Sequence, residues 1–217
     1  MSVYLLNDEI TFPDPRLAEP DGFLAVGGDL SVERLLLAYS HGIFPWYNEG
    51  EPIKWWCPRE RFIIRPERIH VSRSVKKFIR QHEIRVIFNR DFADTMHRCR
   101  MLRENTTGTW ITDDMEKSYL ALHKAGYAMS VESLIDGTIA GGLYGVVIGR
   151  CFFGESMYTE VTNGSKLALI FLAQFLAGKG FSMIDCQFHT DHLESMGGET
   201  ISYEEYMKLV RGAQPSE

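Results

Sequence analysis

Two acidic residues lie on otherwise apolar segments of the sequence, where a carboxylate is costly to bury unless it is paired or used. Glu155 belongs to the segment CFFGESMY and Asp185 to FSMIDCQF, and both segments have the composition of strands. Because side chains alternate along a strand, we expect Asp185 and Gln187 to share one face. Glu155 would share a face with Phe153 and Met157. Two strand ends that each present an acid beside apolar residues predict a pocket with a polar centre.

Positive charge is concentrated in one part of a chain whose net charge is −6. Residues 59–103 hold 13 Lys or Arg against 5 Asp or Glu, which indicates a local anionic partner. Within this stretch Ser72 is suited to cap a helix, and the basic residues after it recur at helical spacing: Arg73, Lys76, Lys77 and Arg80. Such a helix face can follow successive phosphates, although an ordinary solvated helix has the same pattern.

The elements that would position these side chains are marked by turn and capping residues. Residues 1–61 contain three early prolines, a helix capped by Ser31 and two aromatic runs, HGIFPWY and WWCP. The aromatic runs predict either a small aromatic core or the wall of a site. The dipeptide Asp-Gly at 136–137 predicts a hairpin turn, so residues 128–158 would form an antiparallel meander ahead of the apolar helix and a further strand. After that strand, HTDHLESMGGETIS predicts a loop with one helical turn.

This order of elements is similar to that of GNAT acyltransferases. We therefore expect an α+β fold with a small N-terminal domain (1–61) and a GNAT-like acyltransferase domain (62–217). The second domain would hold a mixed, mainly antiparallel sheet flanked by helices. GNAT enzymes bind the pyrophosphate of acyl-CoA at a glycine-rich turn before the central helix. Here that turn reads TEVTNGS, with a single glycine, which indicates a different acyl donor.

Several classes of protein are excluded by what the sequence lacks. No run of about 18 apolar residues is present, so we expect no membrane span. The N-terminal MSVYLLNDEITFPDP has no basic region followed by an apolar stretch, unlike a secretory signal. The cysteines have no paired spacing, which indicates reduced thiols in a cytoplasmic protein. Cys186, His189 and His192 have a zinc-like spacing, but structural zinc needs a fourth ligand that the sequence does not offer.

Several strings of uncommon residues follow one another over nearly the whole chain: GFLAVGGDLS (22–31), HGIFPWY (41–47), WWCP (55–58), HVSRSVKK (70–77), TWIT (109–112), GGLYGV (141–146), FGESMY (153–158), IDCQ (184–187) and DH (191–192). In this order they resemble the leucyl/phenylalanyl-tRNA–protein transferases, bacterial enzymes that add Leu or Phe to proteins beginning with Arg or Lys. Together they are far more specific than any single motif. The resemblance implies transfer of an aminoacyl group from tRNA to a protein α-amine, with no cofactor.

The resemblance also implies a role for each candidate residue. Asp185 and Gln187 would be the catalytic pair, in which Asp185 orients Gln187 and holds the incoming amine. Glu155 would meet the N-terminal Arg or Lys of the acceptor, Tyr39 and Tyr119 would lie near the adenosine, and the basic helix face would bind tRNA. The aminoacyl pocket would be lined by Trp46, Trp110, Leu143, Phe152, Met157, Leu169, Leu172, Leu176 and Ile184.

Three of these pocket positions depart from the family pattern as we align it. Leu143 stands where Met is expected, and Leu172 and Leu176 stand where aromatic residues are expected. A pocket lined by Leu is still apolar, so we expect it to accept Leu, Phe and, less readily, Met. One methylene discriminates by only about 1–3 kcal/mol, and we expect Leu-tRNA to be preferred by a margin of that kind.

Two other functions share parts of the pattern. A CoA-dependent GNAT-type N-acyltransferase would have the same fold but needs a phosphate-binding turn. A non-catalytic tRNA-binding module would keep the basic helix and have no use for Asp185 or Gln187, and Asp185 would then be a structural salt-bridge partner. The family resemblance favours the enzyme, and implies a monomeric cytoplasmic protein that marks its acceptors for degradation through their N-terminal residue.

Overall fold

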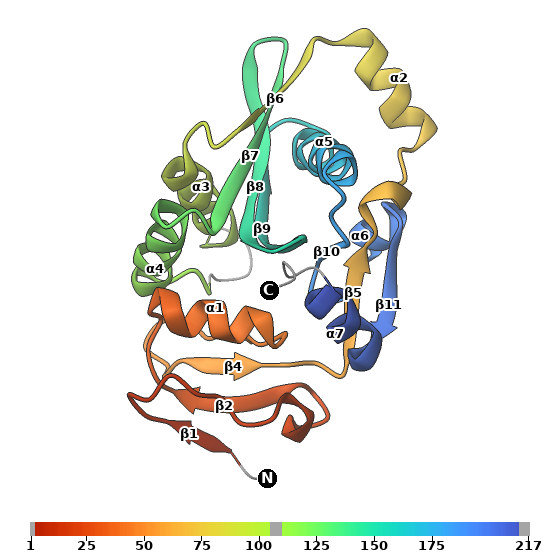
Figure 1. Ribbon diagram of the computed structural model, residues 1–217. Coiled ribbons are helices and arrows are strands. Elements are labelled where there is room, and N and C mark those ends of the chain that lie inside the picture. The colour runs from red at the N-terminus through yellow and green to blue at the C-terminus, as the bar shows by residue number, and fades with distance from the viewer. Residues whose placement is uncertain (1–2, 105–109, 213–217) are drawn as a thin grey trace.

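The computed structural model describes residues 3–104 and 110–212, which form two β-sheets with helices between and around them (Figure 1). The predicted α+β class is confirmed, with a small N-terminal unit and a larger, mixed and mainly antiparallel sheet. Thr109 of the TWIT string lies outside the described residues.

The N-terminal unit is built on a four-stranded sheet in the order β1-β2-β4-β3. Strands β1 and β2 are parallel, and β4 pairs antiparallel with both β2 and β3. The sequence pattern does not reveal these strands, because they are short and prolines interrupt the spacing. The elements are β1 (Tyr4–Leu6), a 3-10 turn (Pro15–Leu17), β2 (Phe23–Gly27), β3 (Phe44–Pro45) and β4 (Lys54–Trp56).

Helix α1 (Val32–Ser40) lies between the two sheets, in contact with β3, α4 and β8 (Figure 1). It begins as the capping pattern predicts, since the Ser31 hydroxyl accepts a hydrogen bond from the Arg34 amide. Gly42 ends the turn after the helix in a left-handed conformation, with φ 74°. A Cβ at this position would lie 2.7 Å from the Tyr206 ring, so the close approach of α7 also requires glycine.

The larger sheet has seven strands in the order β11-β5-β10-β9-β8-β7-β6. From β6 to β9 each strand is antiparallel to its neighbour, β10 is parallel to β9, and β5 pairs antiparallel with β10 and β11. The predicted Asp-Gly hairpin between β7 and β8 is confirmed. The segment GETIS was expected to be part of a loop, because it has no clear apolar alternation, but it forms strand β11. The strands are β5 (Glu60–Ile64), β6 (Ile84–Phe88), β7 (Ala128–Ile135), β8 (Thr138–Ile148), β9 (Cys151–Thr159), β10 (Met183–Asp185) and β11 (Gly198–Ser202).

Helices cover both faces of this sheet. The apolar helix α5 contacts β7, β8 and β9, while α3 and α4 lie on the opposite side and α7 packs near β5 and β11 (Figure 1). The predicted caps are confirmed at Ser72 and Thr112, whose hydroxyls accept the amides of Val75 and Met115. The helices are a 3-10 turn (Pro66–Arg68), α2 (Arg73–Gln81), α3 (Phe92–Glu104), α4 (Asp113–Lys124), α5 (Gly164–Gly178), α6 (Asp191–Ser195) and α7 (Tyr203–Gly212).

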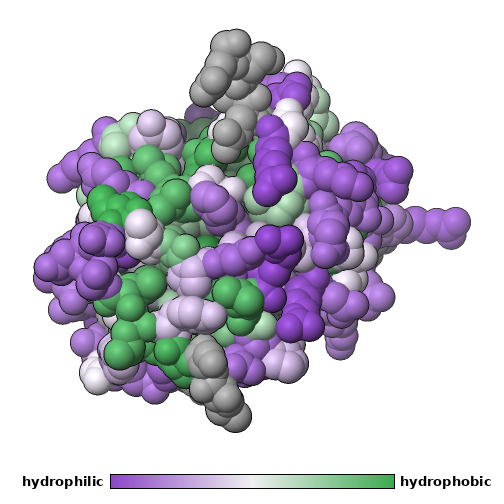
Figure 2. Space-filling view, turned by 60° about the horizontal axis from the view of Figure 1, so that its bottom comes forward, coloured by the Kyte–Doolittle hydropathy of each residue, from purple (hydrophilic) through white to green (hydrophobic). Residues whose placement is uncertain are grey.

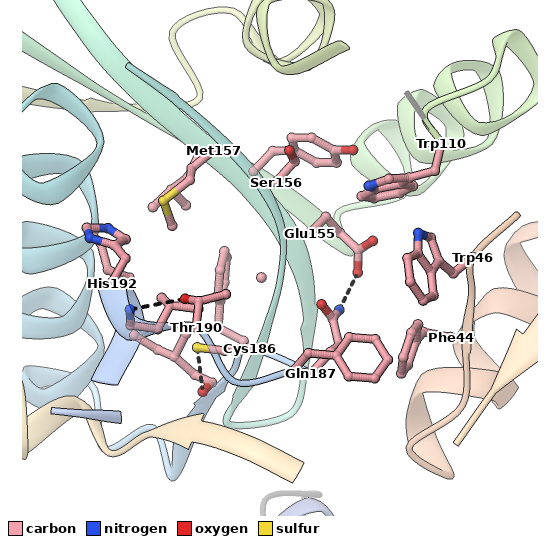
Figure 3. A pocket seen from close by; sticks show the side chains of 18 of the residues that line it. Phe44, Trp46, Trp110, Glu155, Ser156, Met157, Cys186, Gln187, Thr190 and His192 are labelled. Atoms are coloured by element: carbon pink, nitrogen blue, oxygen red, sulfur yellow. Dashed lines mark hydrogen bonds between the residues drawn. The ribbon is translucent and has the colours of Figure 1, made fainter. Parts of the chain in front are cut away.

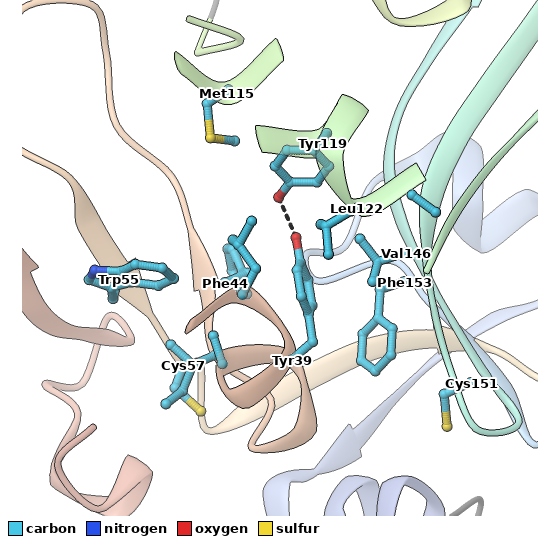
Figure 4. Close-up of a cluster of buried hydrophobic side chains, with 14 of the residues drawn as sticks. Tyr39, Phe44, Trp55, Cys57, Met115, Tyr119, Leu122, Val146, Cys151 and Phe153 are labelled. Carbon is cyan, nitrogen blue, oxygen red and sulfur yellow. Dashed lines mark hydrogen bonds between the residues drawn. The ribbon is translucent and has the colours of Figure 1, made fainter. Parts of the chain in front are cut away.

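One apolar core joins the two sheets (Figure 4). Tyr39 and Trp55 from the N-terminal unit belong to the same buried cluster as Phe153 of β9 and Tyr206 of α7. A second cluster surrounds α5. The expected boundary between residues 61 and 62 falls inside β5, which belongs to the larger sheet. The two units therefore share their interior.

Two irregularities on adjacent strands shape the space between them. The pairing of β8 with β9 shifts by one residue, which leaves Glu155 as an extra residue between Gly154 and Ser156. Strand β10 pairs with β9 only as far as Asp185, and Gln187 then turns the chain with a left-handed φ of 60°. The two strands therefore stop pairing at the point where the predicted site residues begin.

No helix among the described residues is long and apolar enough to cross a membrane. Apolar side chains are nevertheless exposed in the N-terminal unit, where Leu5 of β1 is 83% exposed and Leu17 is 55% exposed. Figure 2 turns the lower part of the molecule in Figure 1 toward the viewer, and hydrophobic side chains gather on one half of this face.

Candidate active site

A cavity of about 470 Å³ lies where β9 and β10 stop pairing, beside α5, α6 and the aromatic residues of β3 (Figure 3). Most of its walls are apolar, and a few polar side chains converge on it, which is the usual form of a small-molecule site. Its lining residues are Phe44, Pro45, Trp46, Trp110, Leu143, Tyr144, Phe152, Gly154, Glu155, Ser156, Met157, Leu169, Ile184, Cys186, Gln187, Phe188, Thr190, His192 and Leu193.

Glu155 is the acid at the polar centre of the cavity, and three neighbours hold it. Its carboxylate accepts hydrogen bonds from the Tyr39 hydroxyl at 2.6 Å, the Tyr119 hydroxyl at 3.1 Å and the Gln187 side-chain amide at 3.3 Å. The two tyrosine hydroxyls also contact each other (Figure 4). Because Gln187 donates its NH₂ group to Glu155, its amide oxygen remains to accept a hydrogen bond from a substrate.

The burial of this cluster changes its protonation. Desolvation raises the pKa of the Glu155 carboxyl to about 7, and the hydrogen bonds from Tyr39 and Tyr119 oppose that shift. Desolvation, followed by the nearby charge of Glu155, raises the pKa of both tyrosines well above its usual value. The tyrosines are therefore protonated donors at neutral pH, while Glu155 changes its charge close to neutrality. A cation that enters beside Glu155 would favour the ionised form.

Asp185 does not line the cavity, because it is fully buried behind it. Its carboxylate forms a buried ion pair with Arg61 and accepts hydrogen bonds from the Tyr206 hydroxyl and the Gln187 backbone amide, both at 2.8 Å. The expectation that Asp185 and Gln187 share a face is wrong, since β10 ends at Asp185 and Gln187 is left-handed. Cys186 and Gln187 face the cavity instead. Asp185 reaches the site through the backbone of Gln187.

The bulge at Glu155 corrects the expected faces of β9 in the same way. Phe153 packs into the shared core, whereas Glu155, Ser156 and Met157 all line the cavity. An extra residue in a strand interrupts the alternation of side chains and re-aims those that follow. The prediction that Phe153, Glu155 and Met157 share one face is therefore wrong, because Phe153 faces the core while the other two face the cavity.

Aromatic rings surround the polar centre at one end of the cavity (Figure 3). Trp46 and Trp110 lie beside Glu155, and Phe44 lies beside Gln187. The ring centroid of Phe188, the next residue after Gln187, is 5.7 Å from that of Phe44. Trp46 is 42% exposed, and its ring centroid is 5.5 Å from that of Phe188. Partly exposed aromatic rings can stack on a nucleobase. The predicted aromatic wall is thus present here, while Trp55 of the same sequence region belongs to the core.

The opposite end of the cavity, near Met157, is mainly apolar, and His192 and Thr190 are its polar side chains (Figure 3). Leu172 and Leu176 of α5 are fully buried in the cluster around that helix and do not line it. Tyr39 and Tyr119 are also fully buried, and they reach the cavity only through the Glu155 carboxylate. The predicted pocket residues that do line the cavity are Trp46, Trp110, Leu143, Phe152, Met157, Leu169 and Ile184.

The basic residues predicted to bind tRNA lie on α2, at the opposite end of the molecule from the N-terminal sheet (Figure 1). Val75 and Phe78 turn the apolar side of this helix toward the cluster around α5. Elsewhere in the basic stretch, Arg65, Arg98 and Arg100 are paired with carboxylates. By contrast, four exposed basic residues of α2 form no ion pair within the described part of the chain: Arg73, Lys76, Lys77 and Arg80.

The turn before α5 does not form a phosphate cradle. The Ser165 amide donates to the Thr159 hydroxyl at 3.2 Å, so this donor at the helix start is already used. Gly164 packs against β8 so closely that a Cβ would lie 1.9 Å from the carbonyl oxygen of Ala140. The single glycine of TEVTNGS therefore serves the packing of α5 on the sheet, which disfavours a CoA pyrophosphate at this helix start.

The zinc-like spacing does not produce a converging ligand set. Within the described ranges, the possible ligand atoms that do converge belong to His189, Asp191 and Glu194, and all three side chains are exposed. Cys186 and His192 are not part of that group. Burial raises the pKa of the Cys186 thiol well above its usual value, so the protonated thiol lines the cavity.

The sequence pattern did not indicate several residues that matter to this site. Arg61 and Tyr206 surround the carboxylate of Asp185, and Phe188 lines the cavity. His192 lines it too, although the sequence had offered it only as a zinc ligand and as part of the DH string. A signal for Arg61 was present, because a cation in the apolar run RFII is as unusual as the acid in FSMIDCQF. Phe188 and His192 follow β10 in a segment without periodicity, so nothing in the pattern places them beside β9.

Two family models match the chain. The model described as leucyl/phenylalanyl-tRNA protein transferase matches residues 63–211, and the model of its N-terminal domain matches residues 28–59. A leucyl/phenylalanyl-tRNA–protein transferase of Desulfatibacillum aliphaticivorans is 54% identical over 200 residues, which cover 92% of this chain and 86% of the relative. The corresponding protein of Syntrophobacter fumaroxidans is 49% identical over 97% of this chain and 90% of its own length.

Solved structures with detectable similarity align less closely. The structure of L-PGS from Bacillus licheniformis aligns with a TM-score of 0.46 and 12% identity, over 88% of this chain and 73% of that one. The aminoglycoside acetyltransferase meta-AAC0020 from an uncultured soil metagenomic sample aligns with a TM-score of 0.37 and 15% identity, over 64% of this chain and 92% of that one.

Proposed function

The chain belongs to the leucyl/phenylalanyl-tRNA–protein transferase family, and we propose that it moves Leu or Phe, and less readily Met, to proteins whose N-terminal residue is Arg or Lys. Its class as an aminoacyltransferase that acts from tRNA onto protein follows from the family. One observation carries the rest of the proposal. The cavity holds a buried carboxylate, Glu155, bonded to an amide, Gln187, between an aromatic end and an apolar end.

The reaction exchanges an ester for an amide. The neutral α-amine of the acceptor attacks the carbonyl carbon of the aminoacyl ester, and a C–N bond forms as the C–O bond to the terminal ribose breaks. The proton that the amine loses leaves on the ribose oxygen. An amide is more stable than an ester, so the step needs no ATP. Groups that hold amine and ester together, and that donate to the developing oxyanion, account for the acceleration.

Gln187 is the residue that we assign to the attacking amine. Its NH₂ group is engaged by Glu155, so its oxygen accepts a hydrogen bond from the amine and directs the lone pair toward the ester. An amide is too weak a base to keep the proton, so Gln187 positions the amine and the ribose oxygen takes the proton. Asp185 supports Gln187 from behind the cavity and does not itself touch the substrate.

Glu155 is the residue that we assign to the side chain of the acceptor's first residue. A guanidinium or ammonium that reaches its carboxylate forms a charge-assisted hydrogen bond in a partly enclosed site. An N-terminal Asp or Glu would be repelled by the same carboxylate. Tyr39 and Tyr119 hold the Glu155 carboxylate in place, whether the acceptor begins with Arg or with Lys.

The two ends of the cavity suit the two parts of the aminoacyl-adenosine. The aromatic end beside Trp46 and Trp110 offers stacking surfaces for the adenine, and the apolar end offers space for the amino-acid side chain. Leu143 lines the cavity and pairs with Met157 across β8 and β9, so it offers an apolar contact to the amino-acid side chain, and we keep the expectation that Leu-tRNA is preferred. Leu172 and Leu176 act only through packing. The exposed cations of α2 would hold the phosphate backbone of the tRNA.

The test is the transfer of labelled Leu from Leu-tRNA to peptides that begin with Arg or with Asp. We expect transfer to the Arg peptide alone, and a loss of roughly 100-fold in Asp185→Ala and Gln187→Ala, since misplaced groups at a reacting centre cost about that much. Transfer to the Asp peptide would overturn the role of Glu155. Absence of transfer with tRNA still bound would indicate a binding module. In competition, equal or better use of Phe-tRNA would contradict the preference for Leu.

The product would carry a new N-terminal Leu or Phe. We propose that this residue marks the acceptor for degradation, and that the reaction takes place in the cytoplasm, where aminoacyl-tRNA is made. We also propose that the enzyme acts as a monomer of 24.8 kDa.

A further inference from the structure

One buried cation links the two walls of the cavity from behind. Arg61 on β5 is fully buried, and all its nitrogen atoms are engaged. Its Nε and Nη2 donate to Asp185, and its Nη1 donates to the carbonyl oxygen of Gly42 at 2.6 Å. Its Cζ also lies 5.0 Å from the ring centroid of Phe44 and 4.5 Å from that of Tyr206. The guanidinium therefore contacts both sides of the cavity at once: the segment 42–44 that enters β3, and Asp185 at the end of β10.

Tyr206 completes this arrangement from α7. Its hydroxyl donates to Asp185 at 2.8 Å and accepts from Arg61 Nη2 at 3.2 Å. A buried carboxylate is stable only when donors satisfy its oxygen atoms. For Asp185, the donors are Arg61, Tyr206 and the Gln187 amide. If one donor is lost, the carboxylate must move or admit water.

The contact between Asp185 and Gln187 connects the buried network to the cavity. Gln187 is left-handed, with φ 60°, a conformation that a residue with a Cβ seldom adopts. A side chain of Asp that accepts the amide two residues later stabilises such a turn. Strand β5 holds the same turn from its other side, since the Cys186 amide donates to the Phe62 carbonyl at 2.9 Å. The position of Gln187 thus depends on where Asp185 is held.

We propose that Arg61 and Tyr206 are positioning residues for aminoacyl transfer. Through Asp185 they fix the backbone of Gln187, and through the Gly42 carbonyl Arg61 fixes the wall that carries Phe44. The inference rests on the proposed role of Gln187. Neither Arg61 nor Tyr206 lines the cavity, so both act without touching the substrate. Since the basic helix α2 lies elsewhere, their loss should slow the reaction and leave tRNA binding intact.

The variant Tyr206→Phe removes one hydroxyl and keeps the ring over Arg61. We expect kcat for Leu transfer to an Arg peptide to fall roughly tenfold, with KM for Leu-tRNA unchanged, because Gln187 loses its alignment with the ester. Tyr203→Phe is the matched control. Tyr203 also lies on α7, but its hydroxyl donates to the His41 carbonyl at 3.1 Å, so this variant should keep the parent kcat.

A double-mutant cycle with Gln187→Ala separates positioning from a general loss of stability. If Tyr206 acts through Gln187, Tyr206→Phe should lower kcat much less in the Gln187→Ala background than in the parent. An equal loss in both backgrounds, or an unchanged kcat in Tyr206→Phe, would overturn the positioning role while Gln187 keeps its own. A Gln187→Ala variant with the parent kcat would instead overturn the proposed function of Gln187, and the positioning role with it.

Discussion

Glu155 combines two properties that are seldom found together in a single carboxyl. It is buried against two tyrosines, and it faces a cavity that we assign to a cationic substrate. Desolvation is the main reason that its pKa rises to about 7. Around pH 7, a small change of pH therefore alters the fraction of molecules in which Glu155 is ionised.

The first prediction concerns the pH dependence of transfer. Between pH 6 and 8, kcat/KM for an Arg peptide should rise as Glu155 ionises around pH 7 and as the acceptor α-amine, with a pKa of about 8, becomes neutral. In Glu155→Gln only the rise from the amine should remain. Glu160 is an exposed acid just after β9, so Glu160→Gln is the control, and its profile should keep the contributions of both Glu155 and the amine. Identical profiles for parent and Glu155→Gln would contradict the assignment.

The same pKa shift has a consequence for stability. A carboxyl whose pKa is raised on folding binds its proton more tightly in the folded state, so it stabilises at low pH. That contribution is lost as pH rises from about 4.5 to about 7. Relative to the parent, Glu155→Gln should therefore gain roughly 2 kcal/mol of unfolding free energy between pH 5 and pH 8, measured by urea denaturation.

At the residue scale, the sequence identified which acids were unusual but not what they contact. The apolar surroundings of Glu155 and Asp185 correctly predicted that both are held by specific partners. Strand alternation then gave the wrong face for Asp185, because a bulge and a left-handed residue are set by tertiary pairing. Arg61, the partner of Asp185, lies 124 positions away, beyond the reach of any local pattern.

At the scale of elements, local signals were most reliable where one side chain decides the geometry. The caps at Ser31, Ser72 and Thr112, and the Asp-Gly turn, were predictable because their hydrogen bonds lie within a few residues. The strands of the N-terminal sheet and β11 were not. Each is short, and only its neighbours in the sheet make it a strand.

Helix α2 gives a prediction of its own. Replacing Arg73 and Arg80 by Ala should raise KM for aminoacyl-tRNA and leave kcat unchanged. If each residue contacts one phosphate, the slope of log affinity against log salt should become shallower by about 1.5 in total. The control is Lys208→Ala, which removes an exposed cation from α7 and should change neither quantity. An unchanged salt dependence in the double variant would place the tRNA elsewhere.

At the scale of the whole molecule, the shared core predicts that the two sheets unfold together. Far-UV circular dichroism reports the whole chain, whereas tryptophan fluorescence reports mostly the N-terminal unit, which holds Trp46 just after β3 and Trp55 and Trp56 in β4. Because Trp55 packs in the same cluster as Phe153 and Tyr206, we expect the two signals to give one coincident urea transition. Separate midpoints would show that the N-terminal unit folds independently.

Two substitutions sharpen this test. Trp55 is fully buried and its Nε1 donates to the Gly27 carbonyl at 2.9 Å, so Trp55→Ala should cost about 3–5 kcal/mol and shift both signals equally. Leu5 of β1 is 83% exposed, and Leu5→Ala should change the unfolding free energy by less than about 0.5 kcal/mol.

The distribution of charge over the molecule also makes it an electric dipole. Residues 1–58 contain three Lys or Arg against nine Asp or Glu, and each of the three cations is paired with an acid of its own region. The exposed cations of α2 lie at the other end of the molecule (Figure 1). In the field of a polyanion such a body rotates before it makes contact, so tRNA would meet the α2 end first. The acidic end would then face outward, where it would attract acceptor proteins with the basic N-termini that we propose.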